Sequence, residues 1–89
     1  MIPDILYIEG MKDYVKIFIS SSPRPVITKM SLKTLEEKLS SYQFVRTHKS
    51  YILSAKKITA IKRDLVCIGS VELPLSENYK AHLEKMLSL

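Results

Sequence analysis

Short apolar segments separated by turn residues constrain the fold of this 89-residue chain more than any other feature. Between Asp13 and Ile19, apolar and polar residues alternate, which is typical of a half-buried strand. Gly69-Ser70 separates two further apolar segments and predicts a two-residue hairpin with glycine first. Segments with strand character occur at 6–8, 13–19, 26–30, 57–62, 65–68 and 71–75. Strand pairing should dominate the fold, and strands do not alternate with helices as a parallel sheet requires.

Two helices are expected, and both are short. Ser31 should cap the first, over 31–39, in which leucines recur at helical spacing. We expect this leucine stripe to face the core rather than a partner. Ser76 should cap the second helix, whose apolar stripe is formed by Tyr79, Leu83 and Met86. Neither helix is long enough to be stable alone.

Length and composition narrow the class of protein. A chain of this size forms one small domain with a modest core. No apolar run approaches the roughly 20 residues that span a bilayer. The first residues also lack a basic segment followed by an apolar one, so we expect neither a secretory signal nor a membrane partner. Cys67, the only cysteine, lies in an apolar run and should be a buried structural thiol. These features fit a cytoplasmic protein.

Positive charge is concentrated in one part of the chain. The net charge of the chain is +5, and residues 46–63 contain no Asp or Glu. Such a segment attracts polyanions such as nucleic acid. The alternative is an ordinary solvated surface whose acids come from elsewhere in the fold. The cations of the segment are Arg46, Lys49, Lys56, Lys57, Lys62 and Arg63.

Within this segment, 46–50 places two cations, a histidine and a serine between apolar flanks. The flanks can be buried, which would hold the polar centre as a fixed projection. Its donors can reach phosphate oxygens and base edges. An ordinary surface turn is the alternative interpretation.

No arrangement of residues indicates an enzyme. Catalysis requires a nucleophile, a base and a group that orients the base, and the spacing of His48 and Ser50 provides no such set. Two histidines and one cysteine are too few for a structural zinc site. Gly10 and Gly69 are isolated, so there is no phosphate-binding loop. We expect a protein without catalytic activity, cofactor or metal.

Four motifs, in order, resemble the LytTR domain, the DNA-binding output module of a class of bacterial response regulators. They are YIEGMKDYVKI at 7–17, SLKTLEEKL at 31–39, FVRTHKSYI at 44–52 and ELPLSENYK at 72–80. The third is similar to the family signature F-x-R-x-H-[RKN]-S-[YF]-[IL]. The likeness runs from about Asp4 to the end, so we interpret 1–89 as a single LytTR-like domain.

The resemblance implies a mainly β fold with two short helices and elongated antiparallel sheets. It also implies that DNA is contacted by three loops, at 11–14, 48–50 and 76–80, rather than by a recognition helix. The DNA-binding residues that it suggests are Lys12, Asp13, Tyr14, Arg46, His48, Lys49, Ser50, Ser76, Glu77, Asn78 and Lys80.

The chemistry of the second loop leaves alternatives open. Lys49 can donate to guanine or to a phosphate. Arg46 can contact a phosphate, brace the loop or pair with a nearby glutamate. His48 can donate to a phosphate or hold the turn through the backbone, and Ser50 can do either as well.

The other two loops carry a mixture of groups. Lys12 suits a phosphate, and Tyr14 can reach a base or cover the sheet. The amides after Ser76 form a helix N-terminus that attracts phosphate, while Asn78 can read a base and Lys80 adds a cation. Glu77 departs from the family, which often has a cation or small polar residue there. Its carboxylate repels phosphate but can accept from cytosine N4 or complement the helix dipole.

The function expected from this resemblance is sequence-specific binding of double-stranded DNA for transcription regulation. Family members usually carry an upstream receiver domain and bind direct repeats as two copies, so we expect the chain to be part of a longer two-component response regulator. One alternative is a β module that binds RNA or single strands, for which Tyr14, Phe18 and Tyr42 are the few candidate stacking residues. The other is a protein-interaction module that uses the leucine-striped helix.

Overall fold

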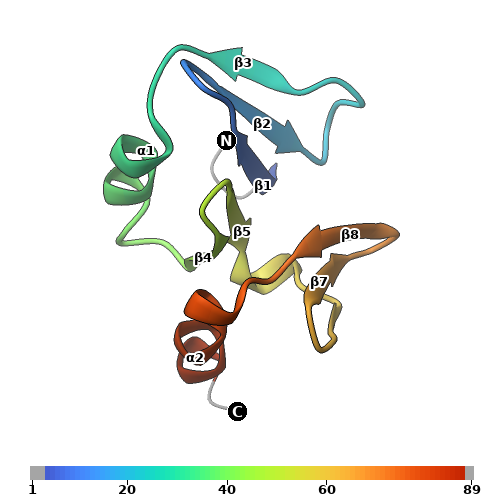
Figure 1. The fold of residues 1–89 in the computed structure, drawn as a ribbon. Coiled ribbons are helices and arrows are strands. Elements are labelled where there is room, and N and C mark those ends of the chain that lie inside the picture. Colours follow the sequence, from blue (N-terminus) through green and yellow to red (C-terminus); the bar gives the residue numbers. More distant parts are fainter. Residues whose placement is uncertain (1–3, 88–89) are drawn as a thin grey trace.

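The computed structural model describes residues 4–87, which form two antiparallel sheets and two short α-helices (Figure 1). The first sheet has the strand order β3-β2-β1-β5-β4, and the second has the order β6-β7-β8. The mainly β, antiparallel fold class expected from the sequence is therefore confirmed. The elements are β1 (Ile5–Gly10), β2 (Val15–Ile19), β3 (Val26–Thr28), α1 (Leu32–Lys38), β4 (Phe44–His48), β5 (Tyr51–Ser54), the 3-10 helix η2 (Ala55–Lys57), β6 (Ala60–Ile61), β7 (Leu65–Ile68), β8 (Val71–Pro74) and α2 (Glu77–Met86).

Helix α1 covers one face of the first sheet. The Ser31 hydroxyl accepts a hydrogen bond from the Thr34 amide at 3.1 Å, so the predicted cap is present. The leucine stripe is buried against the sheet, where each leucine contributes about 1.5–3 kcal/mol through burial. This confirms that the stripe is a core face and leaves it unable to serve as a partner-binding groove. The core on this side consists of Ile8, Val15, Leu32, Leu35, Leu39 and Ile52.

The second sheet and α2 cover the opposite face of the first sheet, and Figure 1 shows them grouped away from α1. Because side chains alternate along a strand, Ile52 belongs to the core under α1 while its neighbour Leu53 belongs to the other. The first sheet is thus the middle layer. The second core consists of Val45, Leu53, Val66, Ile68, Leu73, Leu75 and Leu83.

Two local expectations are confirmed around the second sheet. Gly69 has φ of 61°, the positive value that a glycine-first hairpin turn requires. Cys67 is a buried free thiol. No helix in residues 4–87 has the length and apolar character to cross a membrane.

Other expectations were wrong in detail. Of the strand expected at 57–62 only two residues, Ala60–Ile61, are in a strand; Lys57 ends the 3-10 helix η2, and residues 58–59 are irregular. The chain leaves the first sheet here and enters the second. Thr59 stabilises this crossing, because its amide and its hydroxyl both donate hydrogen bonds to Cys67 O of β7. Met86, expected in the apolar stripe of α2, is 37% exposed. Ser76 lies at the N-cap position, but its side chain makes no capping hydrogen bond.

Candidate nucleic-acid interface

The three loops expected to contact DNA are joined by main-chain hydrogen bonds. The Gly10 amide, at the end of β1, donates to Ser50 O at 2.7 Å. The Ser76 amide, just before α2, donates to Thr47 O at 2.8 Å. The β4–β5 loop therefore lies between the β1–β2 loop and the start of α2. We call residues 11–14, 48–50 and 76–80 together the loop row.

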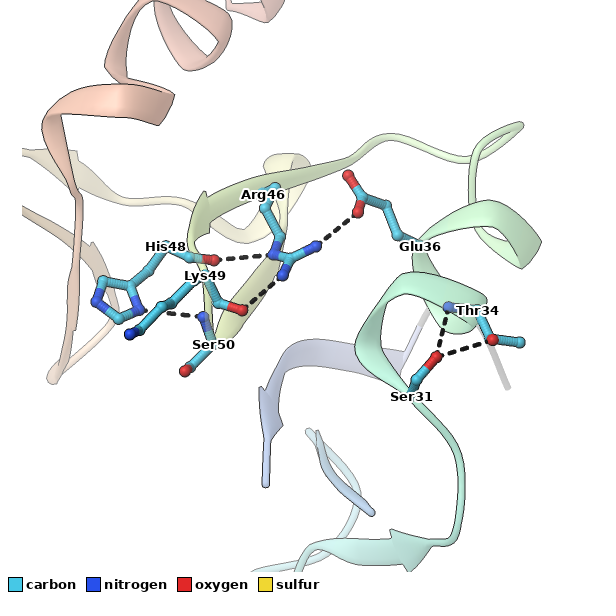
Figure 2. A network of polar contacts seen from close by, with 7 residues as sticks. All are labelled: Ser31, Thr34, Glu36, Arg46, His48, Lys49 and Ser50. Carbon is cyan, nitrogen blue, oxygen red and sulfur yellow. Dashed lines mark hydrogen bonds and ion pairs between the residues drawn. The ribbon is translucent and has the colours of Figure 1, made fainter. Parts of the chain in front are cut away.

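Arg46 holds the middle loop in shape (Figure 2). Its Nε donates to His48 O at 2.9 Å, and its Nη2 donates to Lys49 O. Its Nη1 forms an ion pair with Glu36 Oε1 of α1 at 2.7 Å. The side chain of Arg46 is only 15% exposed. Of the alternatives that the sequence left open, the structure therefore has both the bracing bonds and the glutamate pair.

The same guanidinium also reaches the third loop. Its Cζ lies 5.9 Å from the centroid of the Tyr79 ring in α2, within the range of a cation–π contact. Arg46 thus links α1, the β4–β5 loop and α2. The sequence did not identify Glu36 as the partner of Arg46. The two residues are ten positions apart on different elements, and no local pattern predicts that they come together.

His48 and Ser50 complete the turn through their own contacts. The Ser50 amide donates to His48 Nδ1 at 3.1 Å, so this nitrogen acts as an acceptor and the imidazole supports the loop (Figure 2). The His48 ring also meets the Tyr51 ring edge-on, with centroids 5.9 Å apart. A bulge between Arg46 and His48 shifts the register of β4 against β5. Lys49 lies at the tip, exposed, and forms no ion pair within residues 4–87.

The residues expected in the outer loops are mostly accessible. Lys12, Asp13 and Tyr14 are exposed, and the Met11 amide donates to Tyr14 O at 2.8 Å to close their loop. In the third loop Glu77 and Asn78 are exposed, whereas Ser76 and Lys80 are half-buried.

Glu77 is not an isolated carboxylate. The Nζ atom of Lys80 lies 3.8 Å from its Oε1 atom, one helical turn along α2. The Glu77 side chain is largely exposed, so the pair contributes little to stability. It does offset the charge of Glu77 beside the helix N-terminus, which lowers the repulsion that an approaching phosphate would meet.

Two groups beneath the loop row were not anticipated. The Tyr51 hydroxyl donates to Glu9 Oε2 at 3.0 Å across β1 and β5. Burial, together with this hydrogen bond and the charge of Glu9, raises the pKa of Tyr51 above its ordinary value of 10.0. The Thr47 hydroxyl is fully buried and has no hydrogen-bond partner within the described residues.

The described residues offer no metal site, since no three His, Cys, Asp or Glu side chains in 4–87 gather closely enough to bind an ion. The exposed polar groups of the loop row are instead the donors, acceptors and cations of Lys12, Asp13, Tyr14, Lys49, Glu77 and Asn78. Their chemistry suits contacts with phosphates and base edges.

Comparisons with known proteins point to one family. Residues 1–88 match the family described as the LytTr DNA-binding domain. The chain is 32% identical over 83 residues to a response regulatory protein of Vibrio vulnificus, covering 86% of the chain and 33% of that protein. It is 30% identical over 94 aligned positions to the sensory transduction protein LytT of Bacillus cereus, covering 99% of the chain and 37% of LytT. The chain thus spans about a third of the length of these relatives.

A solved structure has the same fold. The LytTr DNA-binding domain of a Bacillus cereus response regulator superposes with a TM-score of 0.85, covering 98% of this chain and 84% of that one. The sequence identity is 24%, so this likeness supports the fold alone.

Proposed function

The chain belongs to the family of LytTR DNA-binding domains, and from this premise we propose that it binds specific sequences in double-stranded DNA through the loop row. The observation that carries the proposal is the pair of main-chain hydrogen bonds, from Gly10 to Ser50 and from Ser76 to Thr47, that fix the three loops relative to one another. Fixed spacing suits a periodic ligand such as a duplex, in which phosphates and base edges recur at regular intervals.

Size supports a duplex as the ligand. The longest dimension of the domain is 33 Å, and one turn of B-DNA rises about 34–36 Å. The domain is therefore long enough to extend over about one turn of a duplex.

The exposed aromatic residues favour a duplex over single strands. Single-strand binding uses several accessible aromatic faces. Phe18 is stacked on Tyr7, with ring centroids 4.4 Å apart, so one of its faces is covered. Tyr14 and Tyr42 are exposed but lie on separate elements, in the β1–β2 loop and after α1. This pattern provides no stacking platform.

Within the loop row we assign different tasks to the two cations of the middle loop. Arg46 is engaged with internal acceptors and positions the loop. Lys49 is exposed at the tip and donates to a base or a phosphate. His48 supports the turn through Nδ1, and its other nitrogen remains able to donate to a phosphate.

The outer loops complete the proposed contact. Lys12 and the amides after Ser76 hold phosphates, while Tyr14, Asn78 and Glu77 reach sugar or base edges. Glu77 accepts from cytosine N4, with Lys80 beside it to lower the cost of bringing a carboxylate near the duplex. Asp13 is exposed in the first loop, where its carboxylate can accept from cytosine N4.

We further propose that the chain acts as the output domain of a longer cytoplasmic response regulator, preceded by a receiver domain. The relatives described as response regulatory and sensory transduction proteins are about three times as long as the region matched here, which supports this assignment. Two copies on direct repeats would bind more tightly than one, because the second binding event benefits from a raised effective concentration.

The test is to select bound sequences from a random duplex pool and then measure affinity by fluorescence anisotropy. We expect Lys49→Ala to weaken binding to the selected site by about 1–3 kcal/mol and to relax the preference at one base position. The matched control is Lys33→Ala, which removes an exposed cation from α1. Competition with single-stranded DNA and RNA distinguishes the ligand classes. Equal affinity for all three nucleic acids, or no selected consensus, would refute the proposal.

A further inference from the structure

The turn between β6 and β7 carries two cations that the expected loops do not include. Building on the proposed function, we propose that Lys62 and Arg63 in this turn bind DNA phosphates and extend the loop row by a fourth segment. The turn, residues 62–64, is outside every motif that carries the family resemblance.

Main-chain hydrogen bonds place this turn beside the third loop. Leu65 is paired with Pro74 in the second sheet, so the turn lies at the end of the sheet where β8 leads into α2. The Leu75 amide donates to Asp64 O at 3.0 Å. The next amide along the chain, that of Ser76, donates to Thr47 O. One short stretch of backbone therefore contacts the β6–β7 turn and the β4–β5 segment in succession.

The side chains of the turn are free to meet a ligand. Residues 61–64 are all exposed, and the Lys62 amide donates to Leu65 O at 2.8 Å, which keeps the turn compact. Neither Lys62 nor Arg63 takes part in an ion pair within residues 4–87. Asp64 lowers the net charge of the turn to +1, but the bond to Leu75 uses its carbonyl oxygen rather than its carboxylate.

Other cations of the acid-free segment lie elsewhere. Lys56 and Lys57 belong to η2, which follows Ser54 at the end of β5 opposite to Tyr51 and the middle loop. The fold thus separates this segment into cations near the loop row and cations at the far end of the first sheet. Only the cations near the loop row can contact a duplex bound there. Removing equal numbers of cations from the two places therefore tests the inference at the same net charge.

The experiment compares two double variants of the 89-residue chain with equal net charge. Lys62→Gln/Arg63→Gln removes the turn cations, and Lys38→Gln/Lys56→Gln removes two exposed cations outside the loop row, one at the end of α1 and one in η2. Affinity for the selected duplex is measured over a range of salt concentrations, and circular dichroism with urea unfolding verifies that each variant is folded.

If both cations contact phosphates, the log–log salt slope of the turn variant should be shallower by about 1.8, at about 0.9 for each phosphate. The same relation gives affinity about 30-fold weaker near 0.15 M salt, with the difference vanishing near 1 M. The selected consensus should not change, since phosphate contacts carry no base information. Asp64→Asn should raise affinity several-fold, because it removes a carboxylate from the turn and keeps the carbonyl bond.

Equal slopes and affinities for the two double variants would overturn the inference, as would an unaltered affinity for Asp64→Asn. In that case a loss of base preference in Lys49→Ala would still uphold the proposed function. If the unmodified chain itself binds no duplex preferentially, the proposed function fails and the inference fails with it.

Discussion

Replacing Arg46 by lysine tests whether the guanidinium sets the shape of the middle loop. The variant keeps the positive charge, but an ammonium group cannot reach Glu36 Oε1, His48 O and Lys49 O at once, because it lacks the planar fork of arginine. Any loss therefore reports on geometry rather than charge.

The magnitude follows from the exposure of each partner. The Glu36 side chain is 43% exposed, so the ion pair itself contributes at most about 1 kcal/mol. The two bonds to loop carbonyls come from a mostly buried cation and contribute about 1.5–3 kcal/mol each. If lysine keeps one carbonyl bond, Arg46→Lys loses the other carbonyl bond and the ion pair, and the free energy of unfolding should fall by about 1.5–4 kcal/mol. Glu36→Gln should cost less than about 1 kcal/mol.

The loop should also become less ordered in Arg46→Lys. Ordering one or two residues upon binding costs about 1–2 kcal/mol each, so duplex affinity should fall by about fivefold to several-hundredfold. The salt slope should remain that of the unmodified chain if Arg46 braces the loop without contacting a phosphate.

Urea unfolding, fluorescence anisotropy and amide hydrogen exchange together measure these effects. The Gly10 amide is the best local probe, since its hydrogen-bond acceptor is Ser50 O in the braced loop. Its exchange should be faster in Arg46→Lys and nearly normal in Glu36→Gln. The reasoning is refuted if Arg46→Lys retains the exchange rate of Gly10, the stability and the duplex affinity of the unmodified chain.

Three further substitutions test packing, backbone and ionisation. Thr47→Val should raise the free energy of unfolding by about 1 kcal/mol, because it removes a buried hydroxyl without a partner. A lower stability of this variant in urea unfolding would contradict the prediction. Gly69→Ala should lower the free energy of unfolding by about 1 kcal/mol, because alanine disfavours the positive φ while the space around the added Cβ is open. We expect Tm to fall by about 4–8 °C, and an unchanged Tm would contradict this. The raised pKa of Tyr51 means that its contribution to stability is complete below pH 10.0 and is lost as pH rises through the higher folded value. Tyr51→Phe should therefore flatten the decline in stability above pH 10.0, whereas an equally steep decline would rule this contribution out.

Local signals predicted much of the fold. The Ser31 cap, the leucine stripe of α1 and the glycine at position 69 each depend on interactions between residues close in sequence, and each is present. The failures occurred where tertiary contacts override such signals. At 57–62 the change between sheets replaces most of an expected strand, and Ser76 uses its amide toward Thr47 while its side chain makes no cap.

The candidate site divides in the same way. The order and spacing of the motifs predict three DNA-binding loops from chain positions alone, and their contact with DNA stays a prediction. The partner of Arg46 could not be identified, because Glu36 approaches it only after α1 packs on the sheet. The exposed cations at 62 and 63 likewise appeared only as part of a charged segment until the pairing of β7 with β8 placed them next to α2.

The hydrogen bonds from Gly10 to Ser50 and from Ser76 to Thr47 join backbone atoms only. Exchanging a side chain at Lys49, or at Asn78 in the next loop, leaves those bonds in place. With the loop row as the proposed DNA contact, a single substitution there can alter what is recognised without rebuilding the framework that presents the altered residue. Related domains can then diverge in recognition while keeping a common architecture.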